Sequence, residues 1–486
     1  MEKTYLIELL SKLSSKQMRE LSDFVKSPFF NKNESVEKLF EYLRVSHPEF
    51  KPLKIEKELV YKKLFSPAEY NDSFMRMLIF KLTELSEKYL AYSEMTQKPT
   101  DESIYIAGNL LELGLDKNAQ RVINQTEKEL EQIRIKEGKY FLKKFELEKL
   151  KHIIYSRTYK ATTVKDKPDE SLLEESNYLT EFFLINILQR YRYLLNKGQT
   201  VNSHYELDFL PHIMKFLEND GKHYLKDITI SLLYRQISLQ LDPSDEKKFY
   251  EIKKELCNDA TLIDDEDRRD GATVLVNLCI EKGYEGRDEF YRLVLEIDEY
   301  LVSRNLYNRV KGGYFDSEMF MNIVTIALRL GRVEWTKEFI DGNYKKLAPD
   351  IMENIKNFTY ARLYFKTREL DKALLYISKV TYTDLHMKIN ARITSITIHY
   401  ELGNIEEVLM QIENFRKYIQ NDKLLSEGHR KISSNFIKYA GSICKARYSP
   451  RVNLAELKKN IEDCEMVNNR KWLVDKVSEL MQRKQY

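Results

Sequence analysis

Glycine and proline are scarce in this sequence, and their scarcity limits the fold classes that it can adopt. The chain of 486 residues holds 15 glycines and 10 prolines, whereas average usage would give about 34 and about 24. Folds made of many short strands need both residues in their turns. Leucine, lysine and glutamate are abundant instead, and they favour helices. We therefore expect an all-α protein.

Cysteine is also rare. The four cysteines form no C-x-x-C pair and lie far apart in the sequence: Cys257, Cys279, Cys444 and Cys464. A disulfide framework or a zinc site would show paired spacing. We expect reduced thiols in a cytoplasmic protein.

No hydrophobic run is long enough to cross a bilayer. The longest apolar stretches, such as FFLINIL at 182–188, fall far short of the roughly 20 residues that a transmembrane helix requires. The first residues, MEKTYLIELLSKLSSKQ, contain neither the apolar core nor the small-residue cleavage site of a signal peptide. Both observations predict a cytoplasmic protein without a membrane partner.

Neither sign of charge dominates. The 79 lysines and arginines nearly balance the 76 aspartates and glutamates, which leaves a net charge of +3. Such a balance is typical of a surface covered with ion pairs, and it argues against a protein devoted to nucleic acid.

Motifs for catalysis and cofactor binding are missing. The sequence contains no P-loop, dinucleotide-binding, zinc-protease, serine-hydrolase or kinase signature. His204, Asp208 and His212 have the spacing of metal ligands on one helix face. Pro211 interrupts that helix, however, and no second set of ligands supports the three residues. We predict no enzyme activity, no cofactor and no metal site.

The pattern of apolar residues predicts helices from the start of the chain. Between positions 70 and 92, apolar residues at steps of three and four mark the buried face of one long helix: Phe74, Leu78, Leu82, Leu85 and Tyr89. Ser14 and Ser66 have the capping pattern of helix starts, and so does Asp242, which precedes a proline. We predict a compact helical module at 1–95, irregular helical hairpins at 103–310 with a break at 195–203, and repeats with capping helices at 316–486.

Three segments in the C-terminal half repeat one pattern: TIALRLGRVEWTKEFI (325–340), ARLYFKTRELDKALLYI (361–377) and TIHYELGNIEEVLMQI (397–412). In each, a first helix ends at a turn residue, which is Gly331, Arg368 or Gly403. A small or β-branched residue follows five positions later, and an apolar residue follows four positions after that. The segment at 110–123 repeats the pattern around Gly114. A glycine can end one helix and open a tight turn, so each segment is expected to form a helical hairpin.

This spacing resembles the tetratricopeptide repeat, although the tryptophan and proline positions of that repeat are mostly unmatched and Arg368 replaces a turn glycine. The resemblance implies an α-solenoid in the C-terminal half. The motifs SPFFNK, YKKLF…YND…MR, HYEL and WLVDK also resemble a family of uncharacterised cytoplasmic bacterial helical-repeat proteins, which has no established activity to carry over.

The resemblance to the tetratricopeptide repeat implies a non-catalytic protein–protein interaction scaffold. In such repeats the first helices of successive units line a concave face that binds an extended peptide. The candidate contact residues are Asn322, Arg329, Arg362, Lys366 and Asn390. The three cations among them would favour a peptide with acidic groups or a free carboxylate. Ordinary solvated side chains are the alternative interpretation.

Nucleic acid is a second candidate partner. No acidic residue occurs between Glu427 and Glu456, and Lys431, Lys438 and Lys445 recur every seven residues. These lysines form a stripe on one side of a helix, roughly opposite its apolar side. The basic face at 428–455 could bind nucleic acid in a salt-dependent manner, but a solvated outer face explains the same stripe.

The segment FVKSPFFNKNESVEKLF at 24–40 joins two predicted helices. Pro28 disfavours helix at the residue before it and so ends the first helix, and Asn31 has the pattern of a cap for the second. Phe29 and Phe30 are then expected to wedge between the helices, against Phe24, Leu39 and Phe40. Exposure as an aromatic anchor for a partner is the alternative.

Overall fold

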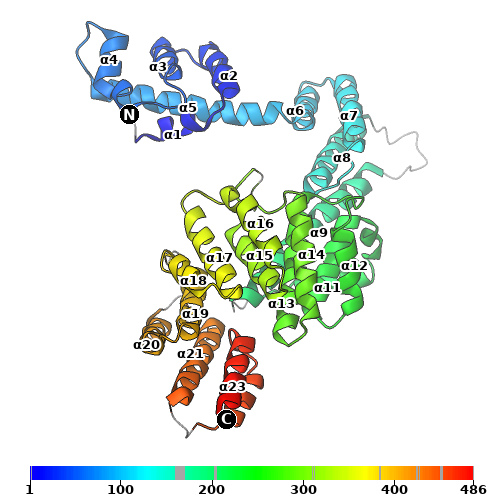
Figure 1. The fold of residues 1–486 in the computed structure, drawn as a ribbon. Coiled ribbons are helices and arrows are strands. Elements are labelled where there is room, and N and C mark those ends of the chain that lie inside the picture. The colour runs from blue at the N-terminus through cyan, green and yellow to red at the C-terminus, as the bar shows by residue number, and fades with distance from the viewer. Residues whose placement is uncertain are drawn as a thin grey trace. The chain divides into compact units, whose positions relative to one another are not determined.

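The structure is a computed structural model, and it describes residues 1, 3–158, 170–201, 205–308, 310, 312–381, 385–422, 425, 427–448 and 452–484. Within these residues the secondary structure consists of helices α1 to α23 and three short 3₁₀ helices, with no strand (Figure 1). The prediction of an all-α fold is confirmed. No described helix combines the length and the apolar character that a membrane crossing requires.

The chain divides into two compact units. Unit 1 comprises residues 1–133 and 142–176, and unit 2 comprises residues 134–141 and 177–486. Two helices contribute residues to both units: α8 (Gly138–Thr158) and α9 (Glu170–Val201).

Helices α1 to α7 lie in unit 1, and the first five of them share a hydrophobic core. Their bounds are α1 (Tyr5–Lys12), α2 (Ser15–Lys26), α3 (Glu34–Arg44), η1 (Pro52–Lys54), α4 (Lys57–Phe65), α5 (Asp72–Thr96), α6 (Pro99–Glu112) and α7 (Asp116–Glu131). Buried apolar side chains from Leu6 to Tyr89 form one cluster. The long helix predicted at 70–92 is α5, and four residues of its predicted stripe are buried: Leu78, Leu82, Leu85 and Tyr89.

Most helices of unit 2 pack in chain order. Their bounds are α10 (Leu210–Glu218), η2 (Lys222–Lys226), α11 (Ile228–Leu241), α12 (Glu246–Leu256), α13 (Asp265–Tyr284), α14 (Glu289–Ser303), α15 (Ser317–Arg329), α16 (Val333–Asn343), η3 (Tyr344–Lys346), α17 (Met352–Lys366), α18 (Leu370–Ile377), α19 (Leu385–Glu401), α20 (Ile405–Asn421), α21 (Glu427–Tyr448), α22 (Leu454–Glu462) and α23 (Arg470–Lys484). One hydrophobic cluster extends from α11 to α19, and a second from α19 to α23.

Helix ends follow the predicted pattern at one site and depart from it at others. At Ser14 the predicted capping box is present, since the backbone N–H of Ser14 donates to Gln17 Oε1 at 2.9 Å and the N–H of Gln17 donates to Ser14 Oγ at 3.2 Å. The capping predictions for Ser66 and Asp242 are wrong, because these residues end α4 and α11. The break predicted at 195–203 is misplaced, because α9 continues to residue 201.

The loop between α2 and α3 separates the two adjacent phenylalanines. Phe30 packs on α2 as predicted, with its ring stacked on Phe24 at 3.9 Å between centroids. The prediction for Phe29 is wrong, because this residue is 84% exposed. Asn31 does not cap α3 either. Its Nδ2 donates to the carbonyl of Val25 at 2.9 Å and holds the loop closed.

The hairpin turns predicted from the repeat are confirmed. The turn residues Gly331, Arg368 and Gly403 have φ angles of 78°, 66° and 82°, and Gly114 in unit 1 has a φ of 74°. In each turn, the N–H of the residue that follows donates to the carbonyl five residues earlier, at 2.8 to 2.9 Å. This bond and the left-handed turn residue define a Schellman motif, which satisfies the last carbonyls of the first helix.

The small residues of the repeat lie where the two helices of each hairpin meet. All four are fully buried: Ala119, Thr336, Ala373 and Val408. The apolar residues four positions further on are buried as well: Ile123, Ile340, Ile377 and Ile412. A short side chain at a position without solvent contact lets the second helix approach the first closely.

A further hairpin of this kind, α13–α14, does not follow the sequence pattern. Gly286 occupies its turn with a φ of 98°, and the N–H of Arg287 donates to the carbonyl of Lys282 at 3.2 Å. Five positions after the turn stands Tyr291, where the other hairpins have a small residue. Gly283 makes room for it, because a Cβ there would lie 2.4 Å from Cζ of Tyr291. In this hairpin the small residue lies on the first helix and the large residue on the second. A search for a small residue five positions after the turn therefore does not find it.

The first helices of three successive hairpins form a row. Helix α15 packs against α17, and α17 packs against α19 (Figure 1). The second helices α16 and α18 each pack against the first helix of the next hairpin. The hairpins from α15 to α20 therefore pack in chain order.

Arg368 is a turn residue whose replacement tests the strain of the left-handed conformation. The substitution Arg368→Gly is expected to raise the free energy of unfolding by about 1 kcal/mol, because glycine adopts positive φ without the steric cost of a side chain. The ion pair of Arg368 with Glu401, at 2.7 Å, contributes less, since the arginine is 63% exposed. Thermal unfolding of both variants measures the effect. R368A loses the ion pair and keeps the strain, so equal unfolding temperatures for R368A and R368G would contradict the prediction.

Candidate functional site

The five predicted partner-binding residues lie on the row of first helices. Asn322 and Arg329 belong to α15, Arg362 and Lys366 to α17, and Asn390 to α19. Asn322, Arg329 and Lys366 are exposed, whereas Arg362 and Asn390 are half-buried. Because α17 packs against both α15 and α19, the structure brings all five onto adjacent helices.

Arg329 is held in place by the neighbouring helix α14. Its Cζ lies 4.1 Å from the ring centroid of Tyr291, and its Nη2 donates to Asp288 Oδ1 at 2.8 Å. A cation–π contact and a charged hydrogen bond together fix the orientation of the guanidinium group. The side chain remains 40% exposed, so the other N–H groups of Arg329 remain available to a partner.

The cations of α17 have different surroundings. Arg362 lies over the ring of Phe358, with 5.8 Å between its Cζ and the centroid. The ammonium group of Lys366, about one turn further on, forms no ion pair or hydrogen bond with any described residue. Lys366 therefore offers an uncompensated positive charge on this row of helices.

A cleft of about 280 Å³ opens between α14 and the turn that joins α15 to α16. It is lined by Arg292, Leu295, Glu296, Glu299, Leu330 and Arg332, and we call it the arginine cleft. Arg332 lies over the ring of Trp335 at 4.7 Å, and its Nη1 donates to Glu299 Oε1 at 2.7 Å. Like Arg329, this arginine is fixed by one ring and one carboxylate.

The arginine cleft is lined by two arginines and two glutamates, and Lys253 beside it adds a third cation. Glu299 pairs with Arg332, and Glu296 accepts a hydrogen bond from Lys253 of α12. Arg292 is exposed, and its guanidinium group pairs with no described residue. Counted with Lys253, three cations face two carboxylates, and Arg292 is the cation that forms no ion pair.

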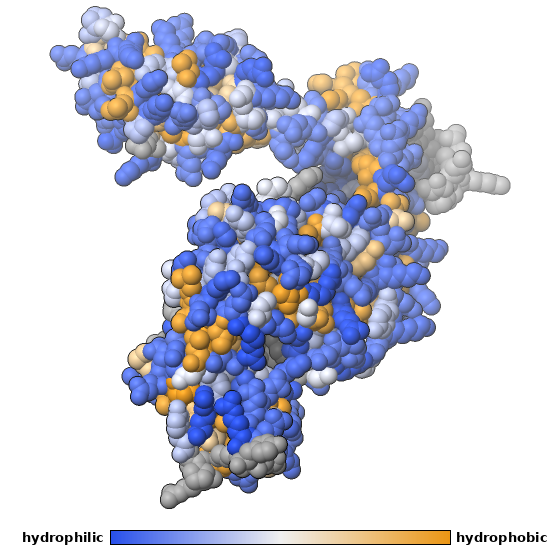
Figure 2. All heavy atoms as spheres, in the orientation of Figure 1, coloured by the Kyte–Doolittle hydropathy of each residue, from blue (hydrophilic) through white to orange (hydrophobic). Residues whose placement is uncertain are grey.

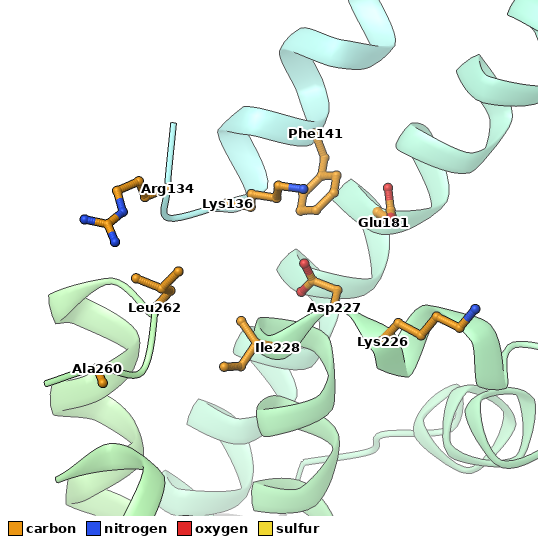
Figure 3. Close-up of a pocket in the computed structure, with 9 residues that line it drawn as sticks. All are labelled: Arg134, Lys136, Phe141, Glu181, Lys226, Asp227, Ile228, Ala260 and Leu262. Carbon is orange, nitrogen blue, oxygen red and sulfur yellow. The ribbon is translucent and has the colours of Figure 1, made fainter. Parts of the chain in front are cut away.

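A larger cleft, of about 580 Å³, lies within unit 2 where the first turn of α8 faces α9 and α11 (Figure 3). Phe141, Ile228 and Leu262 give it apolar walls. Its charged lining residues carry both signs: Arg134, Lys136, Lys226, Glu181 and Asp227. In Figure 3 the guanidinium group of Arg134 points away from Phe141, and the ammonium group of Lys226 points away from Asp227. This arrangement favours no single sign of charge on a ligand.

Asp227 has a structural role in the larger cleft. Its Oδ1 accepts hydrogen bonds from the backbone N–H groups of Thr229 at 2.9 Å and Ile230 at 3.0 Å, which caps α11. Burial raises the pKa of this carboxyl group in spite of these two bonds. Helix capping thus accounts for Asp227 without a ligand.

A buried polar cluster joins α9, α11 and α13. Arg192 is 3% exposed, and its Nη1 lies 3.0 Å from Asp267 Oδ1 and donates to Gln236 Oε1 at 3.1 Å. Burial raises the pKa of Asp267 and outweighs the attraction of the nearby arginine. These groups face one another and not solvent, so the cluster orients the three helices against each other.

The stripe predicted for the basic face at 428–455 is present on α21. Lys431, Lys438 and Lys445 are exposed, and the opposite side of the helix is buried at Phe436 and Ile443. Three lysines on one helix make a smaller basic surface than the continuous patches typical of nucleic-acid-binding domains.

Side chains that could bind a metal ion do not gather in the part of the chain that the structure describes. Within it, no group of three or more His, Cys, Asp or Glu side chains is placed to hold an ion. His204, one of the three residues with ligand spacing, lies outside the described residues. The four cysteines are free thiols, and Cys279 and Cys444 are buried.

On the face drawn in Figure 2, most of the surface is hydrophilic and apolar side chains emerge in several separate groups.

The sequence pattern singled out Arg329 as a candidate but not the two arginines of the cleft. Arg332 directly follows the turn glycine of a predicted hairpin, and this position was a usable signal. Arg292 lies on α14, in the hairpin that the exchange of Gly283 and Tyr291 hides. Recognition of Gly286 as a turn glycine would have placed Arg292 one helix before Arg329.

Comparison with known proteins identifies no relative, since no protein-family model, no curated protein and no solved structure matches the chain. The function proposed for it therefore rests on its own residues and their geometry.

Proposed function

We propose that this chain is a non-catalytic interaction scaffold, which binds a protein or peptide partner on the row formed by α15, α17 and α19. The observation that carries the proposal is the repetition of one hairpin turn, at Gly286, Gly331, Arg368 and Gly403, between helices that pack largely in chain order. We take these hairpins as tetratricopeptide-like repeats of an α-solenoid. Stacked hairpins of that kind present a concave surface made by the first helices, and extended peptides bind there.

The polar groups on this row suit a peptide with acidic character. Asn322 can donate to and accept from a peptide backbone, Lys366 adds an uncompensated charge, and Arg329 presents a guanidinium group that Tyr291 and Asp288 hold in place. An acidic side chain or a terminal carboxylate of the partner would pair with these cations. Free thiols agree with the cytoplasm as the compartment.

Binding of the whole 486-residue chain to an array of synthetic peptides tests the proposal. The charge-reversal variant R362E/K366E is expected to bind the best peptides about tenfold more weakly, because charged hydrogen bonds are lost and repulsion replaces them. The control K417E reverses an exposed lysine on α20 and should change binding less than about twofold. The proposal would be contradicted if the array retained no peptide, or if R362E/K366E bound the peptides as strongly as the control K417E.

A second candidate function, association with nucleic acid, uses the basic face at 428–455. The exposed lysine stripe on α21 favours it, and the near balance of charge in the whole chain opposes it. Salt-dependent binding to double-stranded DNA, lost on reversal of Lys438, would favour this candidate over the scaffold.

A further inference from the structure

We infer that the arginine cleft binds an acidic group of the partner, a carboxylate or a phosphate that stands next to an apolar side chain. This inference rests on the proposed function, because it assigns a chemical character and a contact point to the same partner. Arg292 and Arg332 would bind the anion, and Leu295 and Leu330 would contact the apolar neighbour.

Arg332 is ready to bind an anion before any partner arrives. Trp335 and Glu299 hold its guanidinium group, and only one of its N–H groups is used in the bond to Glu299. The side chain is still 42% exposed. A guanidinium group fixed in this way loses little conformational freedom on binding, and its remaining donors match a carboxylate or phosphate.

Arg292 supplies the charge that nothing in the cleft neutralises. Glu296 and Glu299 already have the cationic partners Lys253 and Arg332. Because these two carboxylates are paired elsewhere, the guanidinium group of Arg292 remains available to an anion of the partner, which an arginine can hold with two parallel hydrogen bonds.

Cohesion of the fold explains part of this cluster but not Arg292. Arg329 binds Asp288, which directly precedes α14, and Arg332 binds Glu299 of α14, so both arginines tie α15 and its following turn to that helix. Arg292 lies on α14 itself, and its guanidinium group is bonded to no other described helix. Cohesion between helices therefore does not use Arg292, and its exposed guanidinium group in the lining of the cleft is available to a ligand.

The size of the cleft points to part of a longer chain as its occupant. A volume of about 280 Å³ is just below the range of pockets for free small molecules, which hold about 300–1,000 Å³. One acidic side chain and one apolar neighbour would fill it. Leu330 of the cleft directly follows Arg329 of the α15 row, so a peptide that lies along α15 can reach both.

Synthetic 12-residue peptides with a fixed central pair in a degenerate background test the inference on the whole chain. The pairs are Glu-Leu, phosphoserine-Leu, Gln-Leu and Ser-Leu, so that the first two arms separate a carboxylate from a phosphate. We expect one acidic pair to be retained about tenfold better than its neutral counterpart. R292E and the milder R292Q are expected to abolish this preference. R190E, which reverses an exposed arginine of α9, should keep it.

The outcomes separate the cleft from the scaffold. Equal retention of acidic and neutral peptides by the wild type, or an unchanged preference in R292Q, overturns the inference and leaves the proposed function standing. Retention of no peptide at all overturns the proposed function and this inference with it. Since Arg292 is exposed and its guanidinium group is unpaired, R292Q should unfold at the temperature of the wild type, which shows that a lost preference does not come from a lost fold.

Discussion

Replacing Asp298 with asparagine is expected to stabilise the protein, by an amount that grows as the pH rises. Asp298 lies on α14 and is 3% exposed. Burial raises the pKa of its carboxyl group from the usual 3.8 to about 8, and no hydrogen bond or neighbouring cation offsets the effect. The native protein therefore carries Asp298 as a neutral acid at pH 7, whereas the unfolded chain ionises it.

The direction of the pH effect follows from this difference in protonation. Between pH 3.8 and about 8, the native state binds a proton that the unfolded state has released, so every rise in pH favours unfolding. Above that range both states are ionised and the loss levels off. Asparagine does not titrate. The gain from D298N should therefore be larger at pH 8 than at pH 5, by about 4 kcal/mol.

Tryptophan fluorescence during urea unfolding measures this difference in unit 2, because the chain has two tryptophans and both Trp335 and Trp472 lie in that unit. The control D371N changes an exposed aspartate of α18 and should shift the free energy of unfolding equally at pH 5 and pH 8. If D298N also gave the same shift at both pH values, Asp298 would not be the buried acid that the structure shows.

Removing the carboxylate of Glu401 is expected to have the opposite effect and to destabilise unit 2 by about 3 kcal/mol. Glu401 ends α19 and binds three groups. Its Oε1 accepts hydrogen bonds from Trp472 Nε1 and from Lys476 Nζ, both at 2.8 Å, and its Oε2 accepts one from Arg368 Nη1 at 2.7 Å. Trp472 and Lys476 belong to α23, so one carboxylate joins a hairpin turn, α19 and α23.

The expected size of the effect comes from burial. Burial alone would raise the pKa of Glu401, but hydrogen bonds from Lys476 and Trp472 outweigh it and the pKa is lowered. The side chain of Glu401 is 10% exposed and that of Lys476 is 4% exposed. Breaking a buried pair costs about 3–5 kcal/mol, since the remaining charge stays desolvated. In the variant, Lys476 still pairs with a second carboxylate, that of Glu479 at 2.6 Å. We therefore expect a loss of stability near the lower end of this range.

The variant E401A tests this prediction by urea unfolding followed with circular dichroism, because the indole of Trp472 loses its own partner in the variant. The double variant E401A/K476M should recover part of the lost stability, since it removes the buried charge together with its partner. R368A serves as the control and should cost less than about 1 kcal/mol because its ion pair is largely exposed. A double variant no more stable than E401A would contradict the explanation by buried charge.

The hairpin turns could be predicted from the sequence because their geometry is local. Gly331 and Gly403 adopt positive φ, and the bond that closes each turn spans five residues. Arg368 takes the same conformation without being a glycine, which shows that the spacing of the helices around it imposes the turn. In the hairpin α13–α14 the small residue, Gly283, stands on the first helix and the large one, Tyr291, on the second. The sequence pattern of the repeat therefore misses this hairpin, although its turn has the same geometry.

Capping residues and aromatic wedges were harder to predict, since a local pattern often allows two outcomes. Ser66 matches the pattern of a helix start but ends α4. Phe29 and Phe30 are adjacent and chemically identical, yet only Phe30 finds the ring of Phe24 and the other is left exposed. The choice between them depends on how the loop closes over α2, through the bond from Asn31 to Val25.

By itself, the sequence determined the all-α class and the positions of four hairpin turns, because both depend on residue spacings of ten positions or fewer. Only the tertiary structure decided which charges pair and which do not. Arg329 and Arg332 bind carboxylates of a neighbouring helix, whereas the guanidinium group of Arg292 stays unpaired in the cleft. The burial of Asp298 was likewise settled by packing. The physical reason is that pairing and desolvation depend on which helices come together, and residues far apart in the chain meet there only after it folds.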